Sequence, residues 1–236
     1  MGNTYTNSMV KNNYIISSAA DTFLNFSISR GRDWQDFCAT WDNLLLDRYM
    51  NDGGSYRYRR YSAFEIDLGK QRISQLEHTP YQQSLSINSL NGGIQRHYEP
   101  LERNFTESPI LQKIIHGFSF LIHSFTAHNR FNIKLHPYRI IATEGKLGEP
   151  APEGLHQDGV DYVVSFMIKK VNILGGESYI ADNHKNIIKK TTLNKPGEFI
   201  LTDDRKLFHG VSSVCVDNKY KAFSYRDVLV IAYSLI

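Results

Sequence analysis

Residues 156–168 of the chain read HQDGVDYVVSFMI, and this stretch is the best single indicator of the fold. Its second half, Tyr162–Ile168, is a short run of apolar and β-branched residues, which is typical of a strand buried in a sheet. The glycine- and proline-rich stretch Gly148–Gly154 precedes it, and Gly175-Gly176 follows it. Because glycine pairs and prolines mark turns, we predict a strand that is bounded by a turn on each side.

Runs of the same kind recur on both sides of this strand. Turn signals separate them, such as Lys195-Pro196-Gly197 directly before one of the runs. Several short strands with turns between them favour a β-sandwich or barrel over a parallel sheet of alternating strands and helices. The further predicted strands are Tyr56–Ile66, Ile133–Ala142, Glu177–Ile180, Glu198–Thr202, Gly210–Val216 and Tyr225–Leu235.

Two helices are predicted before this β-rich part. Apolar residues recur at helical spacing from Asp33 to Tyr49, and again after Ser108-Pro109, which has the form of an N-cap and a first-turn proline. We therefore expect a mostly β protein with flanking helices packed on one face of an antiparallel core. In this prediction residues 1–236 form one domain, in which residues 1–130 are a helix-rich support with an added strand and residues 131–236 are the core.

The composition excludes several classes of protein. The chain has 236 residues, of which 41% are hydrophobic, so it is long and apolar enough to form a sizeable core. Its two cysteines rule out a disulfide scaffold. The net charge is +3 and the basic residues are scattered, so no nucleic-acid partner is predicted. No stretch reaches the roughly 18 apolar residues of a membrane span. We therefore expect a cytoplasmic protein without a membrane partner.

Two His-x-Asp/Glu patterns are present, and their surroundings distinguish them. Alternate residues of a strand point to the same side, so this spacing lets both side chains reach one metal ion. Residues 97–99 (HYE) run directly into Pro100 in a polar stretch without strand character, which predicts a loop. Residues 156–158 (HQD) stand at the start of a predicted strand, at the mouth of the β core. The second pattern is therefore the better candidate for a metal site.

A third ligand is expected from a late part of the chain. His209 lies between the predicted strands Glu198–Thr202 and Gly210–Val216. Two histidines and one carboxylate on one face of an iron ion form a known ligand set, which leaves further coordination positions open. His156, Asp158 and His209 together supply such a set.

Arg226 lies inside the apolar run Tyr225–Leu235. A guanidinium in a buried strand needs an anionic partner, because an unpaired buried charge is costly. Its planar fork is suited to a two-pronged grip on a carboxylate. That carboxylate belongs either to a ligand or to a structural ion pair with Asp227 or a glutamate.

Several motifs in a fixed order resemble those of the 2-oxoglutarate/Fe(II) dioxygenases. The resemblance is greatest to the bacterial group that hydroxylates free aliphatic amino acids, the isoleucine 4-hydroxylase-like enzymes, and it runs from about Asp52 to the C-terminus. The motifs are residues 156–162 (HQDGVDY), 175–178 (GGES), 196–198 (PGE), 203–205 (DDR) leading to 209–211 (HGV), and 225–229 (YRDVL), with Tyr56–Tyr61 and Gly92-Gly93 upstream.

The resemblance implies a double-stranded β-helix, which is a cupin-like jelly roll. It implies that His156, Asp158 and His209 hold Fe(II), and that Arg226 binds the distal carboxylate of 2-oxoglutarate, the cosubstrate used with O2. The implied activity is hydroxylation of an unactivated C–H bond of a free L-amino acid or similar small zwitterion, with release of succinate and CO2. Two alternatives stay open: the same chemistry on a peptide, protein or nucleobase, and a non-catalytic β-barrel that binds a metal or small molecule.

Two features are candidates for binding such a zwitterion. In residues 56–61 (YRYRRY), Arg57 and Arg59 share one face of a strand, and Arg60 lies on the other. Arg57 and Arg59 are candidates to clamp a carboxylate, although base stacking or a solvated strand face is compatible with the same pattern. Asp161 is a candidate to accept an amino group, and it is equally compatible with a turn.

Overall fold

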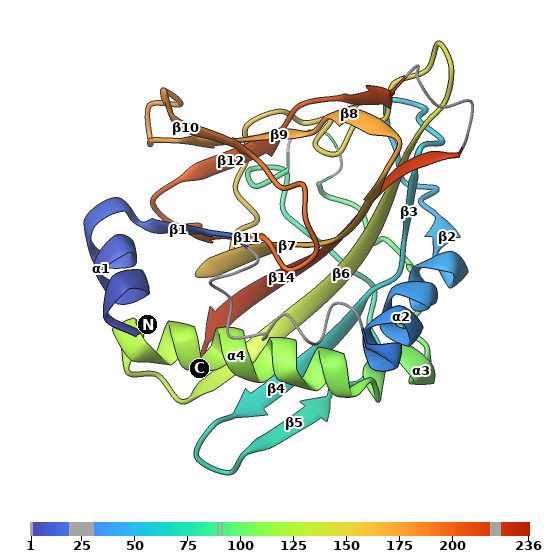
Figure 1. Cartoon of the computed structure of the whole chain (residues 1–236). Helices are drawn as coiled ribbons and strands as arrows, with labels where there is room; N and C mark the ends of the chain where they lie inside the picture. The colour runs from blue at the N-terminus through green and yellow to red at the C-terminus, as the bar shows by residue number, and fades with distance from the viewer. Residues whose placement is uncertain (1, 19–30, 89, 91, 218–222) are drawn as a thin grey trace.

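A large antiparallel sheet runs through the computed structural model, which describes residues 2–18, 31–88, 90, 92–217 and 223–236 (Figure 1). The long strands β6 (Arg130–Ala142), β14 (Ser224–Leu235) and β7 (Tyr162–Val171) form its centre, with β14 between the other two. The remaining described strands of this sheet are β1 (Tyr14–Ser17), β2 (Leu45–Leu46), β3 (Arg57–Arg59), β4 (Ser62–Asp67), β5 (Arg72–Gln75) and β11 (Phe199–Asp203).

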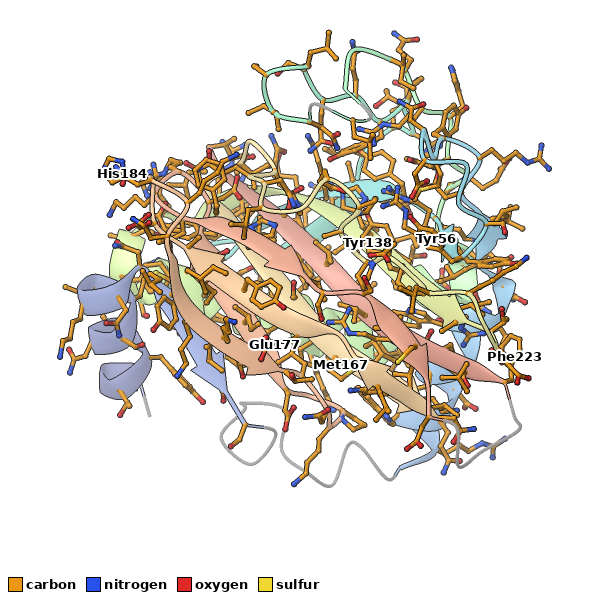
Figure 2. All side chains as sticks on the ribbon, turned by 90° about the horizontal axis from the view of Figure 1, so that it is seen from above. Tyr56, Tyr138, Met167, Glu177, His184 and Phe223 are labelled. Carbon is orange, nitrogen blue, oxygen red and sulfur yellow. The ribbon has the colours of Figure 1, made fainter. Side chains whose placement is uncertain are left out.

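Shorter strands form a second layer above the long ones, as Figure 1 shows. Seen from above, the labelled His184 and Phe223 mark opposite ends of the molecule, and Tyr138 of β6 lies between them (Figure 2). Two facing antiparallel layers are the arrangement of a jelly roll, so the predicted fold class is confirmed. The strands of the second layer are β9 (Glu177–Ala181), β10 (Ile187–Thr192) and β12 (Phe208–Val211), and the pair β8 (Ile173–Gly175) and β13 (Val214–Val216).

The helices cover the outer face of the large sheet. Helix α4 (Pro109–Thr126) begins as predicted: the Ser108 hydroxyl accepts a hydrogen bond from the Ile110 backbone N–H at 3.3 Å. Its Phe118 ring packs edge-on against Phe166 of β7 and Phe199 of β11, with centroids 5.8 and 4.9 Å apart. These contacts fill the space between α4 and the large sheet with apolar side chains. The other described helices are α1 (Gly2–Asn12), α2 (Arg32–Ala39), η3 (Thr40–Asn43) and α3 (Arg103–Thr106).

The helix predicted from Asp33 to Tyr49 is shorter in the structure. Helix α2 ends at Ala39, the 3-10 turn η3 follows, and the chain then extends into β2. Trp34, Phe37 and Trp41 are buried as the helical spacing predicts, but Leu45 and Leu46 are exposed. The apolar spacing therefore predicts a helix that is too long. The same spacing continues into the edge strand β2, where the leucines face solvent.

Two predicted strands are each divided in the structure. Tyr56–Ile66 forms β3 and β4, which pair with different parts of β6, and Gly210–Val216 forms β12 and β13, which pair with β9 and β8. The N-terminal part also contributes β1, β2 and β5, which the sequence analysis did not predict. No helix among the described residues is long and apolar enough to cross a membrane.

Candidate active site

The three predicted metal ligands lie close together between the layers. His156, Asp158 and His209 each place one ligand atom within 4.8 Å of those of the other two. The backbones of the two histidines pair directly, with each N–H donating to the other residue's carbonyl at 2.9 Å. This pairing, rather than a strand start at residue 156, brings together two ligands that lie far apart in the sequence. Asp158 follows in the loop before β7.

The side chains of these three residues present ligand atoms to a common region. The Nδ1 atom of His156 lies 2.9 Å from the Gly154 carbonyl, so its Nε2 atom is the one available to a metal. The Nε2 atom of His209 lies 3.4 Å from Oδ2 of Asp158. Burial opposes ionisation of Asp158, but the hydrogen bond and charge of His209 hold the pKa of this carboxyl below its usual value. The site therefore offers two imidazoles and one anionic carboxylate, which suits Fe(II).

A second carboxylate, that of Asp204, supports the loop that carries Asp158. It is buried, and it accepts hydrogen bonds from the backbone N–H groups of Asp158, Gly159 and Val160 at 2.8 to 3.1 Å. Its Oδ1 atom also lies 3.6 Å from Nδ1 of His209. Asp204 thus contacts segments that carry two ligands, which is how outer residues orient a metal site.

Replacing this support is expected to weaken metal binding without removing a ligand. Asp204→Asn replaces one acceptor oxygen by a donor, so the affinity for Fe(II) should fall by about tenfold, the lower end of what outer-shell substitutions cost. Anaerobic titration of metal-free protein with Fe(II) measures this. Asp203→Asn is the matched control, because the Asp203 carboxylate pairs instead with Arg205 and Lys206. Equal metal affinity in both variants would contradict the supporting role of Asp204.

The three ligands open onto a cavity between the layers, and four arginines line it with them. Arg57 and Arg59 come from β3 and Arg226 from β14, while Arg96 comes from the segment between β5 and α3. The apolar part of the wall consists of Ile140, Pro150, Ala151, Val163, Val211, Val228 and Val230. The cavity therefore combines a metal-ligand set, buried cations and an apolar wall, which is a usual composition of a small-molecule site.

Arg226 projects into this cavity without an anionic partner from the described part of the chain. Its side chain is buried, and its Nε and Nη2 atoms have no hydrogen-bond partner among the described residues. The neighbouring Asp227 is engaged elsewhere, since its carboxylate accepts two hydrogen bonds from Arg139, both at 2.8 Å. Burial lowers the pKa of Arg226 to about 10, so it remains a cation at neutral pH. A buried, unsatisfied guanidinium beside a metal-ligand set fits the distal carboxylate of 2-oxoglutarate.

Arg57 and Arg59 line the cavity and are buried. The interpretation of this motif as a solvated strand face is therefore wrong. Arg57 is held by Asp47, with Nε and Nη2 at 2.9 and 2.8 Å from Oδ2. Arg59 lies over the Tyr98 ring, with its guanidinium carbon 3.8 Å from the centroid. It also approaches Nδ1 of His136 at 2.5 Å.

Burial and the charge of Arg59 lower the pKa of His136 well below its ordinary value, so this imidazole is neutral and its Nδ1 atom accepts from Arg59. On the other face of the strand, Arg60 donates to the Asn43 and Pro100 carbonyls and to Glu102, as the alternation predicts.

The structure does not bring Asp161 to the cavity. Its Oδ2 atom accepts a hydrogen bond from the Leu235 backbone N–H at 2.8 Å, and its Oδ1 atom pairs with Arg205 at 3.1 Å. This carboxylate therefore joins the start of β7 to the end of β14, and the geometry does not support its predicted contact with a substrate amino group.

The sequence analysis did not identify Arg96, Glu153, Asp47 or Asp204 as site residues. Arg96 precedes the HYE pattern in a stretch predicted to be a loop, and Glu153 lies in the turn-rich stretch before His156. A charged residue in a polar loop is usually solvated, so nothing in the sequence gave a reason to place Arg96 or Glu153 in the site. Only burial in the folded chain distinguishes them.

Comparison with known proteins agrees with this geometry. A family model described as 2OG-Fe dioxygenase matches residues 38–232. The chain is 27% identical over 196 residues to L-isoleucine-4-hydroxylase from Bacillus thuringiensis, a match that covers 81% of this chain and 79% of that protein.

Among solved structures, a bsmA homologue from Methylobium petroleophilum superimposes with a TM-score of 0.87 at 29% identity, over 99% of this chain and 93% of that one. The structure of IDO from Bacillus thuringiensis gives a TM-score of 0.79 at 17% identity, over 99% and 95% of the two chains, and this likeness concerns the fold alone.

Proposed function

The chain belongs to the 2OG-Fe dioxygenase family and is a 2-oxoglutarate- and Fe(II)-dependent dioxygenase, and from this premise we propose that it hydroxylates an unactivated C–H bond of a free L-amino acid or similar small zwitterion. The observation that carries the proposal is the cavity in which a His-Asp-His set and the unsatisfied Arg226 meet. Bound Fe(II), with 2-oxoglutarate and O2, supplies the oxidation that transfers one oxygen atom to the substrate and releases succinate and CO2.

In this proposal the protein's residues bind and orient the reactants. His156, Asp158 and His209 hold Fe(II), and the backbone pairing of the two histidines keeps the ligand atoms in place before the metal binds. Arg226 takes the distal carboxylate of 2-oxoglutarate, which supplies the anion that this buried guanidinium lacks. Ile140 and Val228, the cross-strand neighbour and the next residue on the same face as Arg226, keep water from that end of the cavity.

The substrate class rests on two further observations. The cavity carries more buried cationic groups than the distal carboxylate of 2-oxoglutarate needs, because Arg59 as well as Arg226 faces it. Arg59, with Arg57 beside it, is placed to bind a second carboxylate, that of the substrate. The relative from Bacillus thuringiensis is named for the hydroxylation of a free amino acid, and its similarity to this chain supports the same substrate class here.

A coupled turnover screen tests this proposal. The enzyme with Fe(II), 2-oxoglutarate and O2 is offered each of the twenty proteinogenic L-amino acids, and succinate release and product mass are measured. At least one free amino acid should raise succinate release above the rate without substrate and gain one oxygen atom. The matched control is the same amino acid as its N-acetyl methylamide, which resembles a residue within a peptide. Stimulation by the blocked forms alone would overturn the proposal in favour of a peptide or protein substrate.

A further inference from the structure

Arg96 is a buried cation of the cavity wall that the proposed binding of metal and cosubstrate does not use. Its backbone is fixed by two hydrogen bonds with Tyr81, each 2.9 Å long, and its side chain is only 2% exposed. One guanidinium nitrogen donates to Oε1 of Gln83 at 2.9 Å, and the group lies 4.6 Å from the centroid of the Tyr81 ring. The Nε atom has no partner among the described residues.

The side-chain hydrogen bond of Arg96 goes to an amide oxygen and not to a carboxylate of the described residues, although a buried guanidinium gains most from an anion. An amide oxygen and an aromatic face compensate it only in part. Because the side chain lines the cavity, a ligand is the remaining source of the anion.

A second guanidinium lies on the same aromatic ring. The guanidinium carbon of Arg59 is 5.6 Å from the Tyr81 centroid, and that of Arg96 is 4.6 Å from it. Arg59 is also short of anionic contact, since its Nη1 atom is 3.9 Å from an Asp47 oxygen that already binds Arg57. Both guanidinium groups line the cavity and both lack a close carboxylate among the described residues, so a carboxylate from a ligand would compensate them.

The same cavity also offers one carboxylate besides that of Asp158. Glu153 lines it with a side chain that is 11% exposed, and its Oε2 atom has no hydrogen-bond partner among the described residues. Its Oε1 atom lies 3.6 Å from Nε2 of His156, at the edge of the ligand set. A buried carboxylate oxygen without a donor is complementary to an ammonium group.

We propose that the pocket recognises both charged ends of a free α-amino acid: Arg96 with Arg59 binds the α-carboxylate, and Glu153 binds the α-ammonium. This inference rests on the proposed function and makes it more specific. Both end groups of the substrate must be unmodified, so esters, amides and N-acyl derivatives of the same amino acid bind poorly. Glu153 then has the role for which the sequence analysis gave Asp161 as a candidate.

Binding without turnover tests the assignment. The probe is whichever free amino acid gives the greatest succinate release in the screen, together with its methyl ester and its N-acetyl derivative. Dissociation constants are measured by calorimetry on protein loaded with Fe(II) and 2-oxoglutarate in the absence of O2. The wild-type protein should prefer the free amino acid to both derivatives.

The two variants that remove a charge from the proposed site should each lose one of these preferences. Arg96→Gln should raise the dissociation constant of the free amino acid by about tenfold and remove most of the preference over the methyl ester. Glu153→Gln should remove the preference over the N-acetyl derivative and keep that over the ester. Arg96→Lys, which retains the charge, should bind with intermediate affinity. Arg60→Gln is the matched control, because Arg60 lies on the opposite face of the strand and should leave both preferences unchanged.

Three results would overturn the inference. One is an unchanged affinity of Arg96→Gln for the free amino acid while its affinity for 2-oxoglutarate is normal. Another is a Glu153→Gln variant that loses Fe(II) affinity and keeps both preferences, since Glu153 would then serve the metal. The third is a result in which the enzyme turns over the methyl ester and the N-acetyl derivative as fast as the free amino acid. By contrast, a screen in which none of the twenty free amino acids is active contradicts the proposed function for these substrates, whichever residues bind the end groups.

Discussion

Asp158→Ala is expected to abolish the release of succinate from 2-oxoglutarate. The substitution removes the single carboxylate of the proposed ligand set. Loss of an outer-shell partner costs about 10- to 100-fold in metal affinity or activity, so loss of a direct ligand should cost more than about 100-fold. Turnover assays at saturating 2-oxoglutarate and anaerobic Fe(II) titration both measure the effect.

The chain itself supplies a matched control for this experiment. Glu99 belongs to the other His-x-Asp/Glu pattern, and both His97 and Glu99 are exposed in a loop. Glu99→Ala should therefore retain wild-type turnover and Fe(II) binding. An Asp158→Ala variant that binds Fe(II) as well as Glu99→Ala does would remove Asp158 from the metal site.

Arg226→Met is expected to weaken 2-oxoglutarate binding by about 10- to 150-fold, since a hydrogen-bonded charge pair contributes about 1.5–3 kcal/mol. The effect should appear in the KM for 2-oxoglutarate, with less change in kcat at saturation, because the proposed contact is with the distal carboxylate, far from the reacting atoms of the cosubstrate. The affinity for Fe(II) should stay close to that of the wild type, and steady-state kinetics with metal titration measures these quantities.

The same substitution allows a second measurement that separates ligand binding from structure. Arg226 is a buried cation, two of whose nitrogens have no hydrogen-bond partner among the described residues, so replacing it with methionine in protein free of 2-oxoglutarate should not lower the melting temperature. Arg226→Lys retains the charge but not the fork and should have an intermediate KM. If the melting temperature of Arg226→Met falls while KM is unchanged, the residue is structural.

The central strands and helix α4 were predictable from the sequence because their burial follows a short-range pattern. Tyr162–Ile168 and Tyr225–Leu235 are apolar runs flanked by turn signals, and both are central strands of the sheet. The start of α4 was readable from Ser108-Pro109. The end of α2 could not be predicted in this way, because the apolar spacing continues into residues of β2 that are exposed. The candidate ligands were found from a two-residue spacing together with a family resemblance, whereas the strand predicted to start at residue 156 is absent, since β7 begins at Tyr162.

The substrate side of the cavity was only partly predictable. Arg57 and Arg59 were identified by strand alternation, but their burial depends on Asp47, Tyr98 and Tyr138, which come from three other segments. Asp161 was a reasonable candidate by proximity to Asp158, yet the end of β14 uses its carboxylate. Contacts of this kind join residues that are distant in sequence, and no local pattern encodes them.

The position of β14 has a consequence for how the protein is made. This strand follows all the others in the sequence, yet it lies between β6 and β7 in the centre of the large sheet. During synthesis, β6 and β7 therefore leave the ribosome with unpaired edges that only β14 can cover. Such edges are templates for association between chains. A chain that stops before Ser224 would lack both Arg226 and this cover, so aggregation or degradation is its expected fate.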